Sequence, residues 1–168
     1  GGSLGARSLN ESVFHDLGKL NDSGVQVLWQ CGKLYYDKLR DQLSDMELGN
    51  TKLVPFIARM DLAYSIADIV ISRAGAISVS ELCLVKKPVI LVPSPNVAED
   101  HQTKNALALV TKNAALLVKD VEAKDKLITI ALELINDTEQ KNMLRSNIAK
   151  MGKPNATSDI VNELEKLI

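Results

Sequence analysis

Residues 1–6 (Gly-Gly-Ser-Leu-Gly-Ala) form a glycine-rich turn that runs directly into a segment with helical periodicity. Glycines let a backbone approach a ligand closely, and the first turn of a helix presents N–H groups that have no partner inside the helix. Such a site favours an anion, most often a phosphate, and the hydroxyl of Ser3 adds a donor. The turn therefore predicts a phosphate-binding loop, with a plain tight turn as the alternative.

The same turn also fits the Gly-x-Ser-x-Gly pattern of a hydrolase nucleophile elbow, in which Ser3 would attack the substrate. That chemistry needs an acidic residue and a late histidine on other loops. The chain has two histidines, and His15 falls within the first predicted helix, which leaves His101. A phosphate cradle is therefore favoured over a hydrolase.

A second strand-to-helix turn through small residues spans residues 72–81 (Ser-Arg-Ala-Gly-Ala-Ile-Ser-Val-Ser-Glu) and predicts another helix N-terminus facing a ligand. Ser78 and Glu81 fit the capping-box pattern S-x-x-E, which would give Glu81 a purely structural role. Alternatively, the Glu81 carboxylate accepts two hydrogen bonds from a ribose diol, as acidic residues do in nucleotide-binding folds. The residues alone leave both readings open.

Phe56 and Ile57 follow an apolar run and offer an aromatic ring beside a backbone N–H and C=O. This arrangement suits a flat base such as uracil, although these residues by themselves favour an edge strand that runs into a helix.

A polar cluster marks the start of the helix predicted at residues 100–112. Asp100 is expected to be its N-cap, which places His101 and Gln102 in the first turn. Together with Asn105 they supply hydrogen-bonding groups that suit the hydroxyls of a sugar; a solvated helix start is the alternative.

Apolar runs of strand length alternate with helix-period segments along the whole chain. Strands are expected at 25–30, 52–57, 68–72, 88–93 and 115–118, and helices at 7–20, 33–44, 60–66, 77–85 and 100–112, with two or three more near the C-terminus. Strands that are apolar throughout indicate parallel pairing with both faces covered. The pattern predicts one α/β domain with a doubly wound, Rossmann-like parallel sheet. Ligands bind beyond the carboxyl ends of such strands, so the four loops should line one crevice.

Composition narrows the class of protein. The 168 residues are 46% hydrophobic with a net charge of −1, which supports one domain with a real core and gives no electrostatic reason to expect a nucleic-acid partner. No apolar run approaches the roughly 20 residues that cross a bilayer. Cys31 and Cys83 lack a CxxC spacing, so we expect buried free thiols.

Taken together, the loops resemble the C-terminal, donor-binding half of a family 28 glycosyltransferase of the GT-B type, in its peptidoglycan branch. Four stretches carry the resemblance in the family's order and spacing: 1–6, 56–57, 72–81 and 100–106. One such motif would be weak, whereas four in register are specific, and they span nearly the whole chain.

The resemblance implies a UDP-GlcNAc site and assigns its residues. Ser3 would face the diphosphate, the backbone of Ile57 would read uracil beside Phe56, and the amides of Ala76, Ile77 and Ser78 would hold the α-phosphate; Glu81 would bind the ribose, and His101, Gln102 and Asn105 would lie at the GlcNAc.

The resemblance also implies inverting transfer of GlcNAc to undecaprenyl-diphosphate-linked muramoyl pentapeptide, which forms lipid II. Helix N-termini rather than a metal or other cofactor would stabilise the departing UDP. In agreement, the sequence contains no Asp-x-Asp motif.

In this family the acceptor site, the general base and the membrane contact belong to an N-terminal domain, which the sequence does not contain. A strand leading into the first glycine loop, near the sheet centre, is also missing. We therefore expect a fragment, residues 1–168, that binds UDP-GlcNAc weakly and transfers nothing. The whole protein would be peripheral, at the cytoplasmic face of the bacterial inner membrane.

Three other interpretations stay open. One is a stand-alone family 28 hexosyltransferase subunit that recruits a membrane partner. Another is half of a UDP-GlcNAc 2-epimerase, which shares the two-domain architecture. The last is a non-catalytic module that binds a nucleotide sugar.

Overall fold

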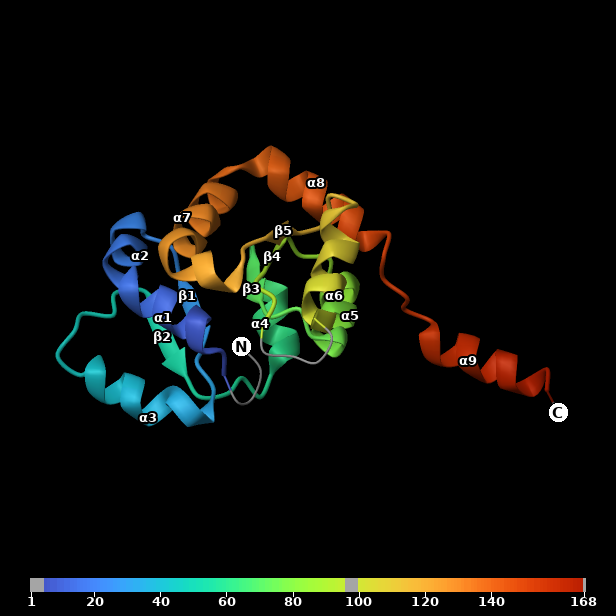
Figure 1. Cartoon of the computed structure of the whole chain (residues 1–168), viewed down its shortest axis with the longest axis horizontal. Coiled ribbons are helices and arrows are strands. Elements are labelled where there is room, and N and C mark those ends of the chain that lie inside the picture. Colours follow the sequence, from blue (N-terminus) through green and yellow to red (C-terminus); the bar gives the residue numbers. More distant parts are fainter. Residues whose placement is uncertain (1–4, 96–99, 168) are drawn as a thin grey trace.

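Helices and parallel strands alternate through the chain in a computed structural model that describes residues 5–95 and 100–167 (Figure 1). The strands are β1 (Val27–Gln30), β2 (Thr51–Val54), β3 (Val70–Ser72), β4 (Val89–Leu91) and β5 (Leu116–Leu117). The helices are α1 (Arg7–His15), α2 (Leu17–Ser23), α3 (Lys33–Gln42), α4 (Met60–Ile66), α5 (Ala76–Val85), α6 (His101–Val110), α7 (Ala123–Asn136), α8 (Thr138–Ala149) and α9 (Ala156–Glu165), and a 3₁₀ turn, η2 (Asp120–Glu122), precedes α7. Every strand predicted from the sequence is confirmed in shorter form, and every predicted helix is confirmed except the one over residues 7–20, which is divided into α1 and α2.

The strands form two parallel sheets rather than the one that the pattern predicts. One sheet pairs β1 with β2, and the other has the order β3-β4-β5. Within the described residues, β1 and β3 do not pair with each other. Apolar patterning identifies a strand but not its neighbour. Side chains of α1 and α7 contribute to the cores under both sheets, so these helices join the two.

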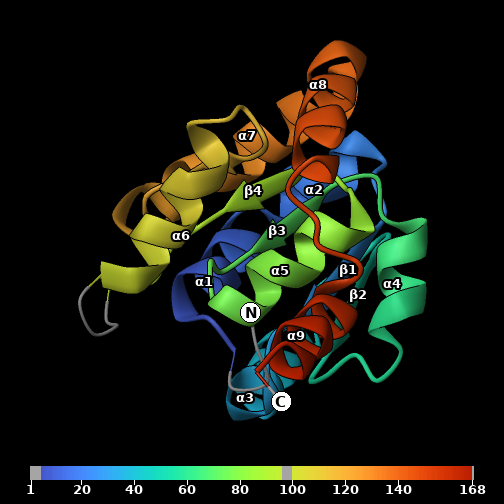
Figure 2. The ribbon, with the colours of Figure 1, turned by 90° about the vertical axis from the view of Figure 1, so that its right-hand side faces the viewer.

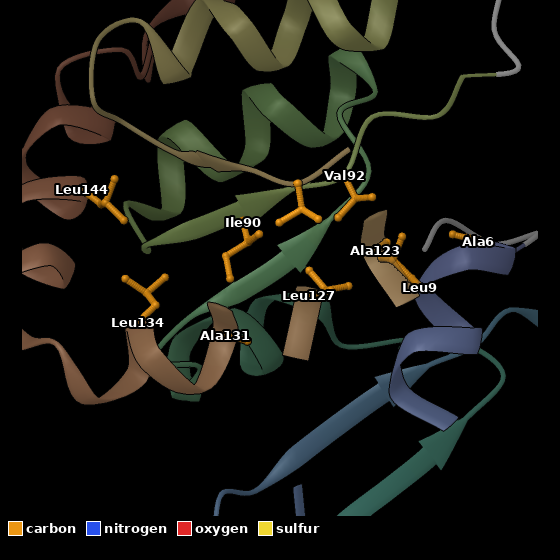
Figure 3. Packing of buried hydrophobic residues seen from close by; sticks show 10 residues of the cluster. Ala6, Leu9, Ile90, Val92, Ala123, Leu127, Ala131, Leu134 and Leu144 are labelled. Carbon is orange, nitrogen blue, oxygen red and sulfur yellow. The ribbon is translucent and has the colours of Figure 1, made fainter. Parts of the chain in front are cut away.

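The central strand β4 is buried on both faces, as predicted for a doubly wound sheet. Val89 and Leu91 pack with side chains of α5 and α6 on one face. Ile90 and Val92 point to the opposite face, towards α1 and α7, as Figure 3 shows. This period-2 alternation, with all four side chains 0% exposed, is why the run contains no polar residue.

The β1–β2 sheet is covered less completely. Trp29 and Cys31 pack against α1, α2 and α3, whereas Leu28 on the other face is 43% exposed. The expectation that both faces of every strand are covered is therefore wrong at β1. Cys31 and Cys83 are buried free cysteines, as predicted, and burial raises the pKa of both thiols.

The helix predicted over residues 7–20 is interrupted at Asp16. The backbone there, with φ −104° and ψ 22°, closes α1 and opens α2. The Asp16 carboxylate is buried and accepts hydrogen bonds from Lys19 and His15. Burial raises the pKa of this carboxyl, but the interactions with Lys19 and His15 together outweigh burial and leave the pKa below its usual value. Both hydrogen bonds go to Oδ1, whereas Oδ2 is buried and has no hydrogen-bond partner among the described residues.

Helix α9 lies apart from the rest of the molecule in Figure 1, and in Figure 2, which is turned by 90°, it is seen in front of the other elements. It contributes no buried residue, and its apolar side chains Ile160, Val161 and Leu164 are exposed. Across the described residues, the helices are all too short or too polar to cross a membrane.

Replacing Leu127 by alanine should lower the free energy of unfolding by about 2–5 kcal/mol, because the side chain is 0% exposed between α7 and β4. Urea denaturation measures the effect. The matched control is Leu34→Ala, at a helical leucine that is 75% exposed, where we expect a change within about 0.5 kcal/mol. Equal losses in the two variants would contradict the assigned core.

Candidate functional site

The described residues predicted to bind a ligand lie in the loop after β2 or in the helices α5 and α6, which begin after β3 and β4. Of the first loop, residues 1–4 lie outside the described residues, and Ser3 with them. Gly5 is described and has φ +86°, and a Cβ at this position would lie 2.2 Å from the backbone oxygen of Cys31. Only glycine fits there, so the loop meets the end of β1 backbone to backbone.

Asn10 fixes α1 to the same strand end. Its buried side chain donates from Nδ2 to the Cys31 oxygen at 2.9 Å and accepts from the Trp29 indole N–H at 2.9 Å. Sequence reasoning did not identify Asn10. Its only signal is a polar residue on the otherwise apolar stripe of the first helix.

The second loop has an exposed aromatic ring beside a backbone amide that is hydrogen-bonded to a side chain. Phe56 is 51% exposed just after β2. The backbone N–H of Ile57 donates to Oε1 of Gln30, the last residue of β1, at 3.1 Å. Gln30 is a second residue that the sequence reasoning missed.

The third loop ends in a helix without a side-chain cap. Gly75 is the N-cap of α5, and within the part of the chain that the structure describes no side-chain cap hydrogen bond closes this end of the helix. The amides of Ala76, Ile77 and Ser78 therefore begin α5 with no partner inside the helix, and Ile77 is 79% exposed. The Ser78 hydroxyl lies 3.9 Å from where a Cβ on Gly75 would be, so it faces the same end of the helix. Three amides and a hydroxyl can together bind an anion.

The capping-box reading of Ser78 and Glu81 is wrong. Ser78 is the third residue inside α5, not its N-cap, because the N-cap is Gly75 and the helix starts three residues earlier than that box requires. Glu81 is exposed, and the Tyr64 hydroxyl lies 3.5 Å from its Oε2. Burial raises the pKa of Tyr64, and the neighbouring Glu81 carboxylate raises it further. Glu81 is thus left without a capping role.

In the fourth loop Asp100 occupies the predicted N-cap position, but it does not cap the helix with its side chain. Asp100 precedes α6 with φ +53°, and its side chain makes no cap hydrogen bond. His101 and Gln102 do form the first turn. Gln102 accepts from the Ser94 amide through Oε1 at 2.9 Å, which fixes its carboxamide against the loop.

Asn105 connects the fourth loop to the third. Its Nδ2 donates to the backbone oxygen of Ala74 at 3.0 Å, one residue before the N-cap of α5. This side chain therefore positions the third loop. Contact of Asn105 with a sugar stays a prediction, as do the ligand contacts of the other residues.

Arg73 links the third loop to the first. Its guanidinium donates to the Val92 oxygen at 3.0 Å and to the Ser8 hydroxyl at 3.0 Å, and it pairs with the Asp120 carboxylate. Ser8 also donates to Asp120. The Arg73 and Asp120 side chains are only 16% and 22% exposed, so the pair is poorly screened by water. Neither residue was assigned a role from the sequence.

These contacts join the four strand-end loops into one connected edge of the molecule. Among the described residues, no group of three or more His, Cys, Asp or Glu side chains is arranged to hold a metal ion.

Residues 1–162 match the family model described as the glycosyltransferase family 28 C-terminal domain. A curated relative from Cytophaga hutchinsonii is 51% identical over 168 residues, which is 100% of this chain and 44% of the relative. One from Christiangramia forsetii is also 51% identical, over 45% of its length. Both are named UDP-N-acetylglucosamine--N-acetylmuramyl-(pentapeptide) pyrophosphoryl-undecaprenol N-acetylglucosamine transferase. The chain thus spans less than half the length of these relatives.

Among solved structures, the crystal structure of Acinetobacter baumannii MurG superposes with a TM-score of 0.86 at 29% identity, over 99% of this chain and 48% of that one. The glycotransferase of kitacinnamycin gives a TM-score of 0.61 at 19% identity, over 97% of this chain and 41% of that one, and shows the fold alone. The α/β fold with parallel strands is the one predicted, and it matches half of a GT-B enzyme.

Replacing Asp120 by asparagine should lower the free energy of unfolding by about 1–3 kcal/mol, because the poorly exposed Arg73 then loses its counter-charge. Urea denaturation again measures the loss. Asp61→Asn is the matched control. Asp61 pairs with Arg59, and because the Arg59 and Asp61 side chains are 68% and 63% exposed, this pair should contribute no more than about 1 kcal/mol. The role assigned to Arg73 fails if the two substitutions cost the same.

Proposed function

Because the chain belongs to glycosyltransferase family 28 and matches its C-terminal domain, we propose that it binds the donor UDP-GlcNAc in an inverting GlcNAc transferase. The acceptor we propose is the undecaprenyl-diphosphate-linked muramoyl pentapeptide, which the relatives' names describe. The observation that carries the proposal is the uncapped start of α5, with the exposed carboxylate of Glu81 further along the same helix.

The diphosphate would bind at the start of α5. The amides of Ala76, Ile77 and Ser78 have no partner inside the helix, and the helix dipole adds partial positive charge at this end. Glu81 would accept hydrogen bonds from the ribose hydroxyls. Tyr64, 3.5 Å from the Glu81 carboxylate, would help to orient it. Ser3 would add a donor from the first loop.

The base and the sugar would bind at the second and fourth loops. Phe56 exposes half of its surface, which a uracil ring could cover by stacking, and the Ile57 backbone lies beside it. His101 and Gln102 would contact the GlcNAc hydroxyls from the first turn of α6. The Ser94 amide fixes the Gln102 carboxamide, which reduces the side-chain entropy lost on binding.

In the reaction, the acceptor hydroxyl would attack the anomeric carbon from the face opposite UDP. A carbon–oxygen bond to the acceptor forms as the bond to the diphosphate breaks, and UDP leaves with the electron pair. The hydroxyl proton passes to a general base outside this chain. We propose that donors at helix N-termini, without a metal, stabilise the charge that grows on the leaving UDP.

For the whole protein we propose a place in peptidoglycan synthesis, bound peripherally at the cytoplasmic face of the bacterial inner membrane. The support is the lipid carrier in the names of the relatives. The acceptor and the membrane would be contacted through parts of the protein other than this domain.

Glu81→Ala should weaken UDP binding to this chain by about ten- to a hundred-fold, because a charged acceptor for two hydroxyls is lost. Isothermal titration calorimetry measures the affinity. Since Glu81 caps no helix, the urea midpoint should stay unchanged. The matched control is Glu133→Ala, another exposed helical glutamate, which should bind UDP like the unsubstituted chain. Unaltered UDP affinity in Glu81→Ala would remove Glu81 from the site.

The transferase assignment is tested by a chimera. This chain replaces the matching 44% of the Cytophaga hutchinsonii relative, and GlcNAc transfer from UDP-GlcNAc to the lipid-linked acceptor is assayed. We expect activity in the chimera and a large loss when it also contains Glu81→Ala. A folded chimera that binds UDP-GlcNAc but transfers nothing would favour a non-catalytic binding module.

A further inference from the structure

Gln30 connects the ends of two neighbouring strands. It is the last residue of β1 and lies opposite Val54, the last residue of β2, in the parallel register. Its half-buried side chain reaches past this pair to the loop that follows β2, where Oε1 accepts the backbone N–H of Ile57 at 3.1 Å. The bond joins residues 27 positions apart in the sequence, at the loop proposed to bind the base.

The carboxamide of glutamine and the edge of uracil offer the same chemistry. Each has a carbonyl oxygen beside an N–H group, and uracil has a carbonyl on both sides of its N3–H. A uracil that donates N3–H to the Ile57 carbonyl therefore brings one of its own carbonyl oxygens towards the Ile57 N–H. That N–H is a single donor, and Gln30 is its acceptor in this structure.

We infer that Gln30 is a placeholder for the base, a positioning residue whose Oε1 holds the Ile57 N–H until a uracil carbonyl replaces it. The inference rests on the proposed function, since it requires that a uracil nucleotide binds at this loop. The half-buried amide stays paired before and after binding, which avoids the cost of an unpaired donor. Binding thus exchanges one acceptor of the Ile57 N–H for another.

The exchange lowers the affinity for the base, and this distinguishes a placeholder from a merely structural contact. Removing the Gln30 acceptor leaves the Ile57 N–H available, so the base has nothing to displace. Loss of a structural contact would disorder the loop and weaken binding instead. The direction of the change in UDP affinity therefore separates the two roles.

The test compares UDP with inorganic pyrophosphate, which has no base, by calorimetry on this chain. Gln30→Met keeps the side-chain length without the amide, and we expect it to bind UDP about three- to ten-fold more tightly. Pyrophosphate affinity should change by less than about two-fold, because α5 is untouched. Gln26→Met, at an exposed glutamine just before the same strand, is the matched control and should change neither affinity.

A second measurement does not depend on the fold of a variant. In the unsubstituted chain, NMR titration with UDP should shift both the Ile57 amide and the Gln30 side-chain amide, whereas pyrophosphate should leave both unmoved. Equal or weaker UDP binding by folded Gln30→Met, or a Gln30 amide that UDP does not shift, overturns the placeholder alone. Failure of the unsubstituted chain to bind UDP at all overturns the proposed function, and the placeholder with it.

Discussion

The guanidinium of Arg73 joins parts of the fold that strand pairing does not join. β1 and β3 belong to separate sheets in the described chain, so hydrogen bonds of a common sheet do not fix the first and third loops relative to each other. Arg73 lies directly after β3 and contacts the Val92 carbonyl, Asp120 and, through Ser8, the first turn of α1. The separation of the N-termini of α1 and α5 depends on this contact. Any ligand that bridges the two helix ends depends on it as well.

The fold could be predicted because its local signals are strong. The run that forms β4 is apolar at every position since both faces are buried, and the helix of residues 60–66 has the predicted limits. A local signal also gave one wrong prediction, the start of α5. The S-x-x-E pattern at Ser78 and Glu81 predicts a cap, but Gly75 starts the helix earlier, and sequence alone does not decide between neighbouring start points. The arrangement of the strands in two sheets is likewise a matter of packing, which the pattern does not contain.

The candidate site was predicted only where its residues lie in short motifs. Phe56 follows β2 closely, Ser78 and Glu81 lie in the helix that follows β3, and the types of these residues indicate chemistry. Gln30 and Asp120 have no such motif. The contact between Ser8 and Asp120 spans 112 positions, and nothing in the sequence around either residue indicates it. Residues that act by positioning another group thus become visible only once the tertiary structure brings their partners together.

One feature of the site is common to all its loops: each described loop is fixed by a side chain from a neighbouring element. Gln30 holds the Ile57 amide, Asn105 holds the Ala74 carbonyl, and Gln102 holds the Ser94 amide. Loops that are fixed before a ligand arrives lose less conformational entropy when it binds, so more of the contact energy remains as affinity. At Ala74 the bond leaves the amides of α5 untouched, whereas at Ile57 it engages the very group that a base would need. The same kind of hydrogen bond therefore favours binding at the phosphate site and lowers the affinity of the base site.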